Sequence, residues 1–314
     1  MSKSIPDMLE EFGIIPVIKI ESAEDAVPLT KALIDGGLPA AEVTFRTAAA
    51  EQAIKNISAA YPEVFVGAGT VLTTDQAQRA IDAGAKFIVS PGFNPKVVDY
   101  CLEQNVTVTP GISTPSELEA ALERGLKVLK FFPAESLGGL EMLKSMSAPY
   151  SDVKFIPTGG INAENLLPYL KFNKVLACGG SWMVKAELIS TKKFDEITHL
   201  VREALTVMLG FRIIGVRLKA ERLDRAAALA RQFQAVFNLP ISLSNSMVQF
   251  SDAFSLKKDD GVGAAGELVI GTQFLKRAIP FLQRSGIKTN SAIQGNCVEL
   301  DLELDGFSVL LQEY

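Results

Sequence analysis

The first two thirds of the chain alternates short apolar segments with longer amphipathic ones. Each apolar segment ends near Gly, Pro or Thr, and the segment after it has the hydrophobic period of a helix packed on a core. Uninterrupted apolar segments are typical of parallel strands that are covered on both faces. The starts of these segments recur at roughly twenty to twenty-six residues. We therefore expect parallel strands at 14–20, 40–45, 64–70, 87–92, 106–112, 128–134, 154–160 and 174–180.

The segments between the expected strands begin and end with helix signals. Thr114-Pro-Ser-Glu117 places a proline in an opening turn with an acid shortly after it. Glycines follow other helical segments at Gly36-Gly37, Gly84 and Gly125. Eight strands that alternate with helices in under 210 residues favour a (β/α)8 TIM barrel over a doubly wound sheet.

The pattern changes after about residue 210. A strand is expected at 212–218, a helix at 221–237, and short strands within 242–256. Another strand at 266–270, a helix at 272–285 and strands at 297–304 and 307–314 complete the chain, with a hairpin turn at Asp305-Gly306. We expect a barrel domain at 1–209 and a small α+β domain at 210–314, whose two βα-then-strands halves suggest an internal repeat.

Composition excludes several classes of function. The net charge is −5, from 31 basic and 36 acidic residues, so clustered positive charge for nucleic acid is not expected. The three cysteines lack zinc-site spacing, and the single histidine, His199, lies in a helical segment and reads as an ordinary helix residue. The N-terminus lacks a signal core, and no run of about 18 apolar residues occurs. The expectation is a cytoplasmic protein that binds neither membrane nor metal.

Polar residues stand at the C-terminal ends of the expected barrel strands, where TIM barrels carry their chemistry. Capping of strand ends is the alternative explanation, and it would account for most of the hydroxyl groups. The set comprises Glu42, Thr44, Arg46, Thr70, Ser90, Thr109, Lys130, Thr158 and Ser181.

Lys130 lies within an apolar strand, VLKFFPA. Desolvation there favours the neutral amine, which is the form that attacks a ketone to give an imine. Lys127 is an odd number of residues away, so one lysine faces inward and the other outward. The alternative is that Lys130 is the outward one and extends between helices.

Glu42, Thr44 and Arg46 share one face of the second strand. An inward carboxylate is costly unless it is paired or functional. Glu42 would then move protons while Arg46 holds a substrate carboxylate bidentately. The alternative is that Arg46 simply neutralises Glu42.

Two double-glycine turns follow the seventh and eighth strands, at Gly159-Gly160 and Gly179-Gly180. Glycine lets backbone amides approach an anion, and these two strands carry the usual phosphate site of such barrels. Each pair could also be only a tight turn. Trp182, Phe132 and Cys178 read as packing residues.

Residues 1 to about 209 resemble the KDPG/KHG aldolases, which act on 2-dehydro-3-deoxy-phosphogluconate and 4-hydroxy-2-oxoglutarate. The resemblance rests on an ordered set of motifs: Pro16-Val-Ile18, Glu42-Val-Thr-Phe-Arg46-Thr, Val66-Gly-Ala-Gly-Thr-Val-Leu72, Ser90-Pro-Gly, Pro110-Gly-Ile-Ser-Thr114, Leu129-Lys-Phe-Phe-Pro-Ala-Glu135, Pro157-Thr-Gly-Gly-Ile161 and Gly179-Gly-Ser-Trp182.

The resemblance implies a role for each matching residue. Lys130 would be the Schiff-base lysine and Glu42 the acid/base, with Arg46 and Thr70 binding the substrate carboxylate. The implied pocket residues are Pro91, Phe132 and Thr158, and the implied phosphate-binding residues are Gly159, Gly160, Gly180 and Ser181. It further implies a homotrimer that needs no cofactor, takes a phosphorylated keto-deoxy sugar acid and releases pyruvate.

Three alternatives stay open. The galactonate epimer or 4-hydroxy-2-oxoglutarate could be the preferred substrate, because the motifs share their pyruvate half. From a different class, the chain could be a non-catalytic sensor of sugar-acid phosphates, although a binder has no need of the Lys130 and Glu42 pair.

Residues 210–314 resemble, more loosely, a vicinal-oxygen-chelate module. Metal-binding modules of that kind place His and Glu ligands on their strands, whereas Ile214 and Glu267 stand where His would be sought and the segment contains no histidine. We expect it to bind no catalytic metal, which leaves an oligomer-stabilising or regulatory role.

Overall fold

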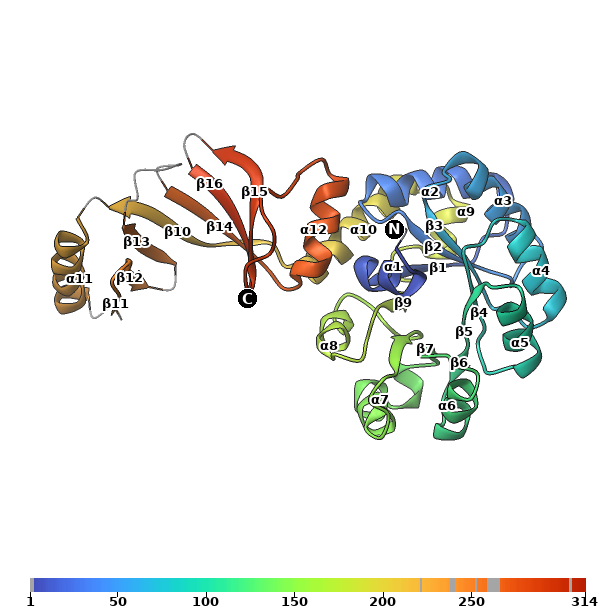
Figure 1. Ribbon diagram of the computed structural model, residues 1–314. Coiled ribbons are helices and arrows are strands. Elements are labelled where there is room, and N and C mark those ends of the chain that lie inside the picture. The colour runs from blue at the N-terminus through green and yellow to red at the C-terminus, as the bar shows by residue number, and fades with distance from the viewer. Residues whose placement is uncertain (1–2, 221, 238–240, 252, 259–265, 305–306) are drawn as a thin grey trace. The chain divides into compact units, whose positions relative to one another are not determined.

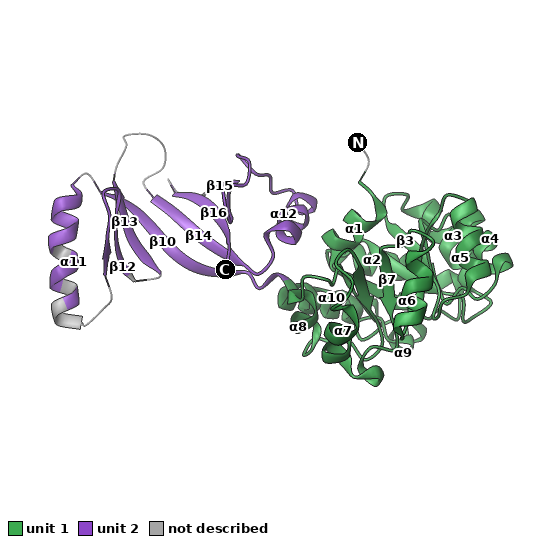
Figure 2. Ribbon diagram, turned by 60° about the horizontal axis from the view of Figure 1, so that its bottom comes forward, with its two compact units in different colours: residues 1–208 green, residues 209–314 purple. Residues whose placement is uncertain are grey.

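The computed structural model describes residues 3–220, 222–237, 241–251, 253–258, 266–304 and 307–314. The chain divides into two compact units, 1–208 and 209–314, and each is described by itself (Figure 2). No helix among the described residues is both long and apolar enough to cross a membrane.

The strands of the first unit are short and parallel, and helices surround them (Figure 1). A six-stranded sheet has the order β5-β4-β3-β2-β1-β9, and a three-stranded sheet the order β6-β7-β8. The strands are β1 (Ile14–Ile18), β2 (Ala40–Thr44), β3 (Phe65–Gly69), β4 (Phe87–Val89), β5 (Thr107–Thr109), β6 (Gly111–Ile112), β7 (Val128–Phe131), β8 (Lys154–Pro157) and β9 (Cys178–Gly180).

Hydrogen bonds between the two sheets close them into a barrel. The bridge between Thr158 and Gly179 joins the end of β8 to β9, and the Gly111 N–H donates to the Ser90 carbonyl beside β4. The fifth predicted strand is split into β5 and β6 at Pro110, which has no N–H for the ladder. Each of the eight predicted strand positions of the barrel is therefore occupied.

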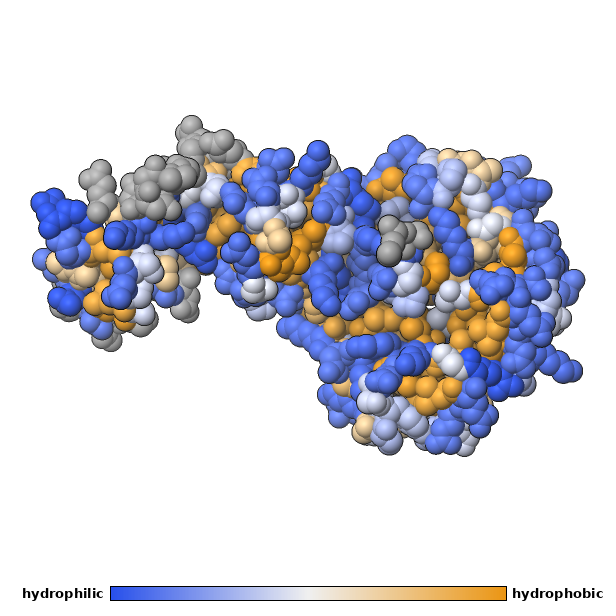
Figure 3. Space-filling view, in the orientation of Figure 1, coloured by the Kyte–Doolittle hydropathy of each residue, from blue (hydrophilic) through white to orange (hydrophobic). Residues whose placement is uncertain are grey.

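The helices of the barrel pack apolar faces on the sheet and turn hydrophilic faces outward (Figure 3). They are α1 (Ile5–Phe12), α2 (Ala26–Asp35), α3 (Ala50–Ala60), α4 (Thr74–Asp82), α5 (Pro95–Glu103), α6 (Pro115–Leu122), α7 (Gly139–Ser147), α8 (Leu166–Lys171), α9 (Ala186–Ser190) and α10 (Phe194–Leu209), with short 3-10 helices η1 (Ala23–Asp25) and η2 (Glu135–Leu137).

The predicted helix ends are confirmed. Helix α6 begins with a capping box between Thr114 and Glu117. Gly37, Gly84 and Gly125 adopt positive φ after α2, α4 and α6.

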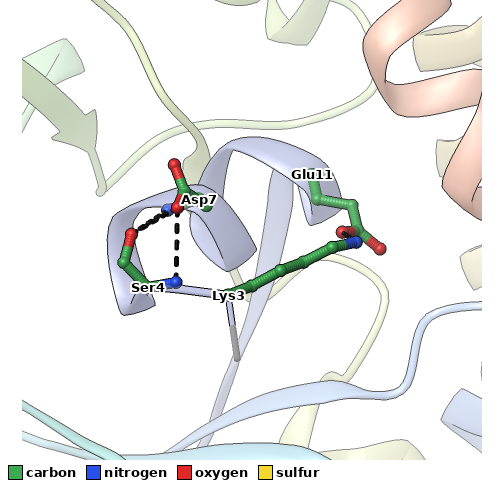
Figure 4. Close-up of polar contacts among 4 residues, drawn as sticks. All are labelled: Lys3, Ser4, Asp7 and Glu11. Atoms are coloured by element: carbon green, nitrogen blue, oxygen red, sulfur yellow. Dashed lines mark hydrogen bonds and ion pairs between the residues drawn. The ribbon is translucent and has the colours of Figure 1, made fainter. Parts of the chain in front are cut away.

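Helix α1 also begins with a capping box, in which Ser4 Oγ accepts from the Asp7 N–H and the Asp7 carboxylate accepts from the Ser4 N–H (Figure 4). Lys3 and Glu11 form an ion pair along the same helix. Its Leu9 side chain is 1% exposed and reaches a small void in the barrel interior. The N-terminal helix is therefore fixed at its start and contributes to the barrel core.

The second unit is a seven-stranded mixed sheet with the order β11-β12-β13-β10-β14-β16-β15. Its elements are β10 (Arg212–Ala220), α11 (Leu223–Phe237), β11 (Ser242–Leu243), β12 (Met247–Ser251), β13 (Phe254–Lys258), β14 (Gly266–Thr272), α12 (Leu275–Arg284), β15 (Cys297–Leu304) and β16 (Phe307–Glu313).

The sheet of the second unit has the internal repeat that the sequence suggested. In each half the first strand pairs in parallel with the last, and the last pairs antiparallel with the strand before it. The two halves meet at the antiparallel pair β10 and β14. Strands β15 and β16 form the predicted hairpin, whose turn at Asp305-Gly306 lies outside the described residues.

Candidate active site

Lys130 and Glu42 face each other inside the barrel. Lys130 lies on β7 and Glu42 on β2, and Lys130 Nζ is 3.6 Å from Glu42 Oε1. Their side chains are 6% and 5% exposed, whereas that of Lys127 is 66% exposed. The predicted division into one inward and one outward lysine is confirmed, with Lys130 inward.

The pair has few other polar partners. Glu42 Oε1 is buried and makes no hydrogen bond with the described residues. The ammonium of Lys130 lies 4.9 Å from the ring centroid of Phe132, within cation–π distance. Burying an ion pair with so little additional hydrogen bonding does not favour stability. Such a pair is therefore more readily explained by a chemical role than by a contribution to folding.

An open cavity of about 630 Å³ lies at the C-terminal ends of the strands, a volume typical of small-molecule sites. Thr158 lines this cavity and also the interior void of about 10 Å³ that Lys130 and Glu42 bound, so it connects the two. The cavity brings together these predicted residues: Thr44, Arg46, Phe132, Thr158, Gly159, Gly160, Gly180 and Ser181.

Lys130 and Glu42 bound the interior void, and two further residues implied by the resemblance do not line the open cavity. Thr70 follows β3 in a left-handed conformation with φ 55°, and Pro91 follows β4. The polar and aromatic lining residues that were not predicted as site residues from the sequence are Lys19, Asn162, Trp182 and Lys185. Trp182 was expected only to pack, and it forms part of the cavity wall.

Several strand-end hydroxyls donate hydrogen bonds to the backbone. Thr44 Oγ1 donates to the Ile18 carbonyl at 2.8 Å, and Ser90 Oγ donates to the Gly92 carbonyl at 2.8 Å. Thr109 Oγ1 makes a longer contact of 3.4 Å to the Ile88 carbonyl. Capping therefore explains these three hydroxyls, as the alternative interpretation held.

The turn after β8 is built around two left-handed glycines, Gly159 with φ 98° and Gly160 with φ 83°. Their carbonyls accept hydrogen bonds, from the Glu135 N–H at 3.1 Å and from Asn165 Nδ2 at 3.0 Å. Among the described residues their own N–H groups have no acceptor. Successive free N–H groups in such a turn form an anion-binding concavity, and both glycines line the cavity.

Other candidate nucleophiles and ligands are not at this cavity. His199 is 71% exposed on α10 beside Glu203, and Cys178 is buried, as expected for both. Burial raises the pKa of Cys101 to about 11, so its thiol stays protonated at neutral pH. Within the described ranges, no group of three or more His, Cys, Asp or Glu side chains is arranged to hold a metal.

A second cavity, of about 470 Å³, lies within the C-terminal unit. Arg217 Nη1 is 3.3 Å from Glu267 Oε2 and Lys257 Nζ is 3.5 Å from Glu267 Oε1. Arg217 also donates to Gln312 Oε1 at 2.9 Å. Glu267, the residue at the expected ligand position, is thus already paired with two cations.

The comparisons with known proteins concern the barrel. The family model described as KDPG and KHG aldolase matches residues 5–200. A 2-dehydro-3-deoxy-phosphogluconate aldolase of Treponema pallidum is 51% identical over 205 residues, which cover 65% of this chain and 98% of that protein. A KHG/KDPG aldolase of Escherichia coli is 45% identical over 202 residues, or 64% of this chain and 95% of that protein.

A solved structure is similar over the same region. The KDPG aldolase of Legionella pneumophila, with pyruvate captured at low pH as a covalent carbinolamine intermediate, has a TM-score of 0.62 and 39% identity, covering 65% of this chain and 99% of that chain. Since the family model spans more than half of the sequence and the matching residues include the Lys130 and Glu42 motifs, the protein belongs to the KDPG/KHG aldolase family.

Proposed function

We propose that the protein is a class I aldolase that cleaves 2-dehydro-3-deoxy-6-phosphogluconate to pyruvate and glyceraldehyde 3-phosphate through a Schiff base on Lys130. The observation that carries the proposal is the buried pair of Lys130 and Glu42, which are 3.6 Å apart and bound a small void that shares Thr158 with the open cavity. The covalent pyruvate in the Legionella pneumophila relative supports it.

The first step makes the substrate an electron acceptor. The amine of Lys130 adds to the C2 ketone, and loss of water leaves a protonated imine. The low exposure of Lys130 keeps bulk water from the imine, and the face of the Phe132 ring, 4.9 Å from the ammonium, favours the positive charge.

The second step breaks the carbon–carbon bond. Glu42 takes the proton of the C4 hydroxyl through a water, and the C3–C4 electrons move into the imine to give an enamine and the aldehyde product. The void beside Glu42 is about 10 Å³, near the smallest volume that holds one water. Protonation of the enamine at C3 and hydrolysis of the resulting imine release pyruvate and restore Lys130.

The two ends of the substrate are assigned to different parts of the cavity. Arg46 can hold the carboxylate bidentately, and Thr70 would assist from the end of β3. Pro91, Phe132 and Thr158 would surround the pyruvyl carbons. The N–H groups of Gly159 and Gly160, together with Gly180 and Ser181 at the end of the neighbouring strand β9, would bind the phosphate.

The galactonate epimer and 4-hydroxy-2-oxoglutarate remain alternatives, because they present the same pyruvyl half to Lys130 and Arg46. The non-catalytic sensor is less well supported, since a binding protein gains nothing from a buried lysine that can form an imine.

The deciding experiment measures pyruvate release from the three substrates with EDTA present. Rapid EDTA-resistant cleavage of 2-dehydro-3-deoxy-6-phosphogluconate supports the proposal, and no cleavage of any substrate refutes it. Borohydride reduction with pyruvate should attach one pyruvyl group to the peptide that contains Lys130.

Lys130→Ala should abolish both turnover and borohydride trapping. Lys127→Ala is the matched control, because it removes an exposed lysine three residues earlier in the chain. Substantial turnover by Lys130→Ala would contradict the assignment of the imine to this lysine.

We also propose that the enzyme works in the cytoplasm, in the Entner–Doudoroff cleavage of sugar acids, and as a homotrimer. Among the described residues of the barrel, the large apolar side chains of Leu72 and Leu102 are 50% and 39% exposed, and a subunit interface could cover them. Light scattering on the purified protein tests the trimer directly.

A further inference from the structure

The glycine turn at Gly159-Gly160 is tied to the segment that follows the Lys130 strand. The Ala134 N–H donates to the Thr158 carbonyl at 2.8 Å, and the Glu135 N–H donates to the Gly159 carbonyl at 3.1 Å. The segment after β7 and the turn after β8 thus run together as a short hydrogen-bonded pair. The position of the turn depends on where Glu135 is held.

Glu135 is held by a tyrosine from the next helix. The hydroxyl of Tyr169, on α8, donates to Glu135 Oε1. Tyr169 is 1% exposed, so its ring is fixed by packing. Burial, with the bond to Glu135 second, raises the pKa of the Tyr169 phenol far above its ordinary value, and the hydroxyl therefore remains a donor at neutral pH.

The Glu135 side chain lies directly against the glycine turn. A Cβ atom on Gly160 would stand 2.5 Å from Cβ and Cγ of Glu135, a distance that real atoms do not reach. A Cβ atom on Gly139, at the start of α7, would lie 3.0 Å from Glu135 Oε1 and 3.2 Å from the Tyr169 hydroxyl. The carboxylate and the phenol are thus packed between two glycines, and a shift of either alters the space beside Gly160.

We infer that Glu135 and Tyr169 are positioning residues that set the place of the Gly159 and Gly160 N–H groups, and thereby the preference for a substrate that ends in phosphate. The inference rests on the proposed function, which puts the phosphate at this turn. Neither residue lines the cavity, so both act through the glycines rather than by touching substrate. Lys130 and Glu42, at the reacting end, lie on strands β7 and β2, whereas Glu135 and Tyr169 lie on η2 and α8.

The test compares a phosphorylated with an unphosphorylated substrate. Tyr169→Phe keeps the ring and removes the donor, and Glu135→Ala removes the acceptor. Glu135→Gln keeps an amide oxygen that still accepts from the phenol, so it should restore most of the wild-type behaviour. Tyr150→Phe is the matched control, because Tyr150 makes the same kind of bond, to Glu119 at 2.9 Å, away from the turn.

We expect kcat/KM for 2-dehydro-3-deoxy-6-phosphogluconate to fall about tenfold in Tyr169→Phe and Glu135→Ala, mostly through KM. For 4-hydroxy-2-oxoglutarate, which has no phosphate, kcat/KM should stay within about twofold of wild type, and so should borohydride trapping of pyruvate on Lys130. Tyr150→Phe and Glu135→Gln should resemble wild type with both substrates. Equal losses for both substrates, or no loss for either, would overturn the inference.

Failure of the inference is distinguishable from failure of the proposed function. If the wild-type enzyme itself did not prefer the phosphorylated substrate, the phosphate site at the glycine turn would be wrong. If the wild type preferred it and Tyr169→Phe kept the full preference, the phosphate site would stand and the positioning role would fall.

Discussion

Removing the lysine from the buried pair should destabilise the barrel, and by an amount that can be worked from the geometry. Lys130 Nζ and Glu42 Oε1 are 3.6 Å apart. With an effective dielectric constant of about 20, two unit charges at that distance attract by about 4 to 5 kcal/mol. Because Glu42 Oε1 has no hydrogen bond among the described residues, little else compensates its charge once the lysine is gone.

A double-mutant cycle measures the interaction free energy between Lys130 and Glu42. Lys130→Met replaces the lysine with an apolar chain of similar length and leaves the carboxylate unpaired, which should cost about 3–5 kcal/mol of unfolding free energy. Lys130→Met combined with Glu42→Gln removes both charges and should recover most of the loss. The coupling energy should be about 3–5 kcal/mol.

Urea unfolding followed by tryptophan fluorescence suits this measurement. The chain has a single tryptophan, Trp182, which lies in the barrel, so the signal reports on the barrel and not on the C-terminal unit. A coupling energy below about 1 kcal/mol would show that the pair behaves like a solvated surface pair, and would refute the assignment of a desolvated site.

Three further predictions concern other parts of the chain. Gly69→Ala would place a Cβ atom 2.1 Å from Glu42 Oε1, so we expect loss of turnover and a destabilisation of about 1–3 kcal/mol in thermal unfolding. Glu117→Ala should cost about 1 kcal/mol at pH 7, since burial alone would raise the pKa of Glu117 but four hydrogen bonds from Ser113 and Thr114 lower it overall. That contribution is present above the unfolded-state pKa and is lost as the pH falls through the lowered folded-state value, so the difference between wild type and variant should vanish in acid. A protein of residues 1–209 should keep its pyruvate-releasing activity, because the Treponema pallidum relative matches the barrel over 98% of its own length; loss of activity in a folded truncated protein would assign the C-terminal unit a part in catalysis.

The alternation of inward and outward side chains along the strands made the reacting residues, Lys130 and Glu42, predictable from the sequence. The alternation of side chains along β7 directs Lys130 inward and Lys127 outward. Because inward side chains of different strands meet inside a closed barrel, Glu42 on β2 lies close to Lys130. Such residues are predictable because a strand fixes the direction of each side chain.

The part of the cavity that is formed by loops beyond the strand ends was less predictable. Lys19, Asn162 and Lys185 line the cavity from positions beyond the strand ends, where no period constrains direction. Thr70 and Pro91 stand at strand ends as expected, yet they are absent from the lining, since the position of a residue around the rim depends on the tilt of the strands.

The contact between Glu135 and Tyr169 joins residues 34 apart in the chain. Pairs of this kind leave no periodic signal, and only the packing of η2 against the glycine turn reveals them. The repeat in the C-terminal unit is the opposite case, because each half retains its own strand and helix pattern and could be read from the sequence.

Under the proposed function, residues on the barrel strands determine the reaction, whereas residues in loops and turns determine the substrate preference. Imine formation depends on side chains whose direction the barrel strands fix, so a change that moved Lys130 or Glu42 would have to distort the sheet. Phosphate recognition depends on backbone N–H groups in a turn held by a few hydrogen bonds, and a small shift there changes the fit of the distal group without moving the lysine. Substitutions around Glu135, Tyr169 and Asn165 should therefore alter which keto acid is cleaved more readily than whether one is cleaved. Substitutions on β2 and β7 should do the reverse.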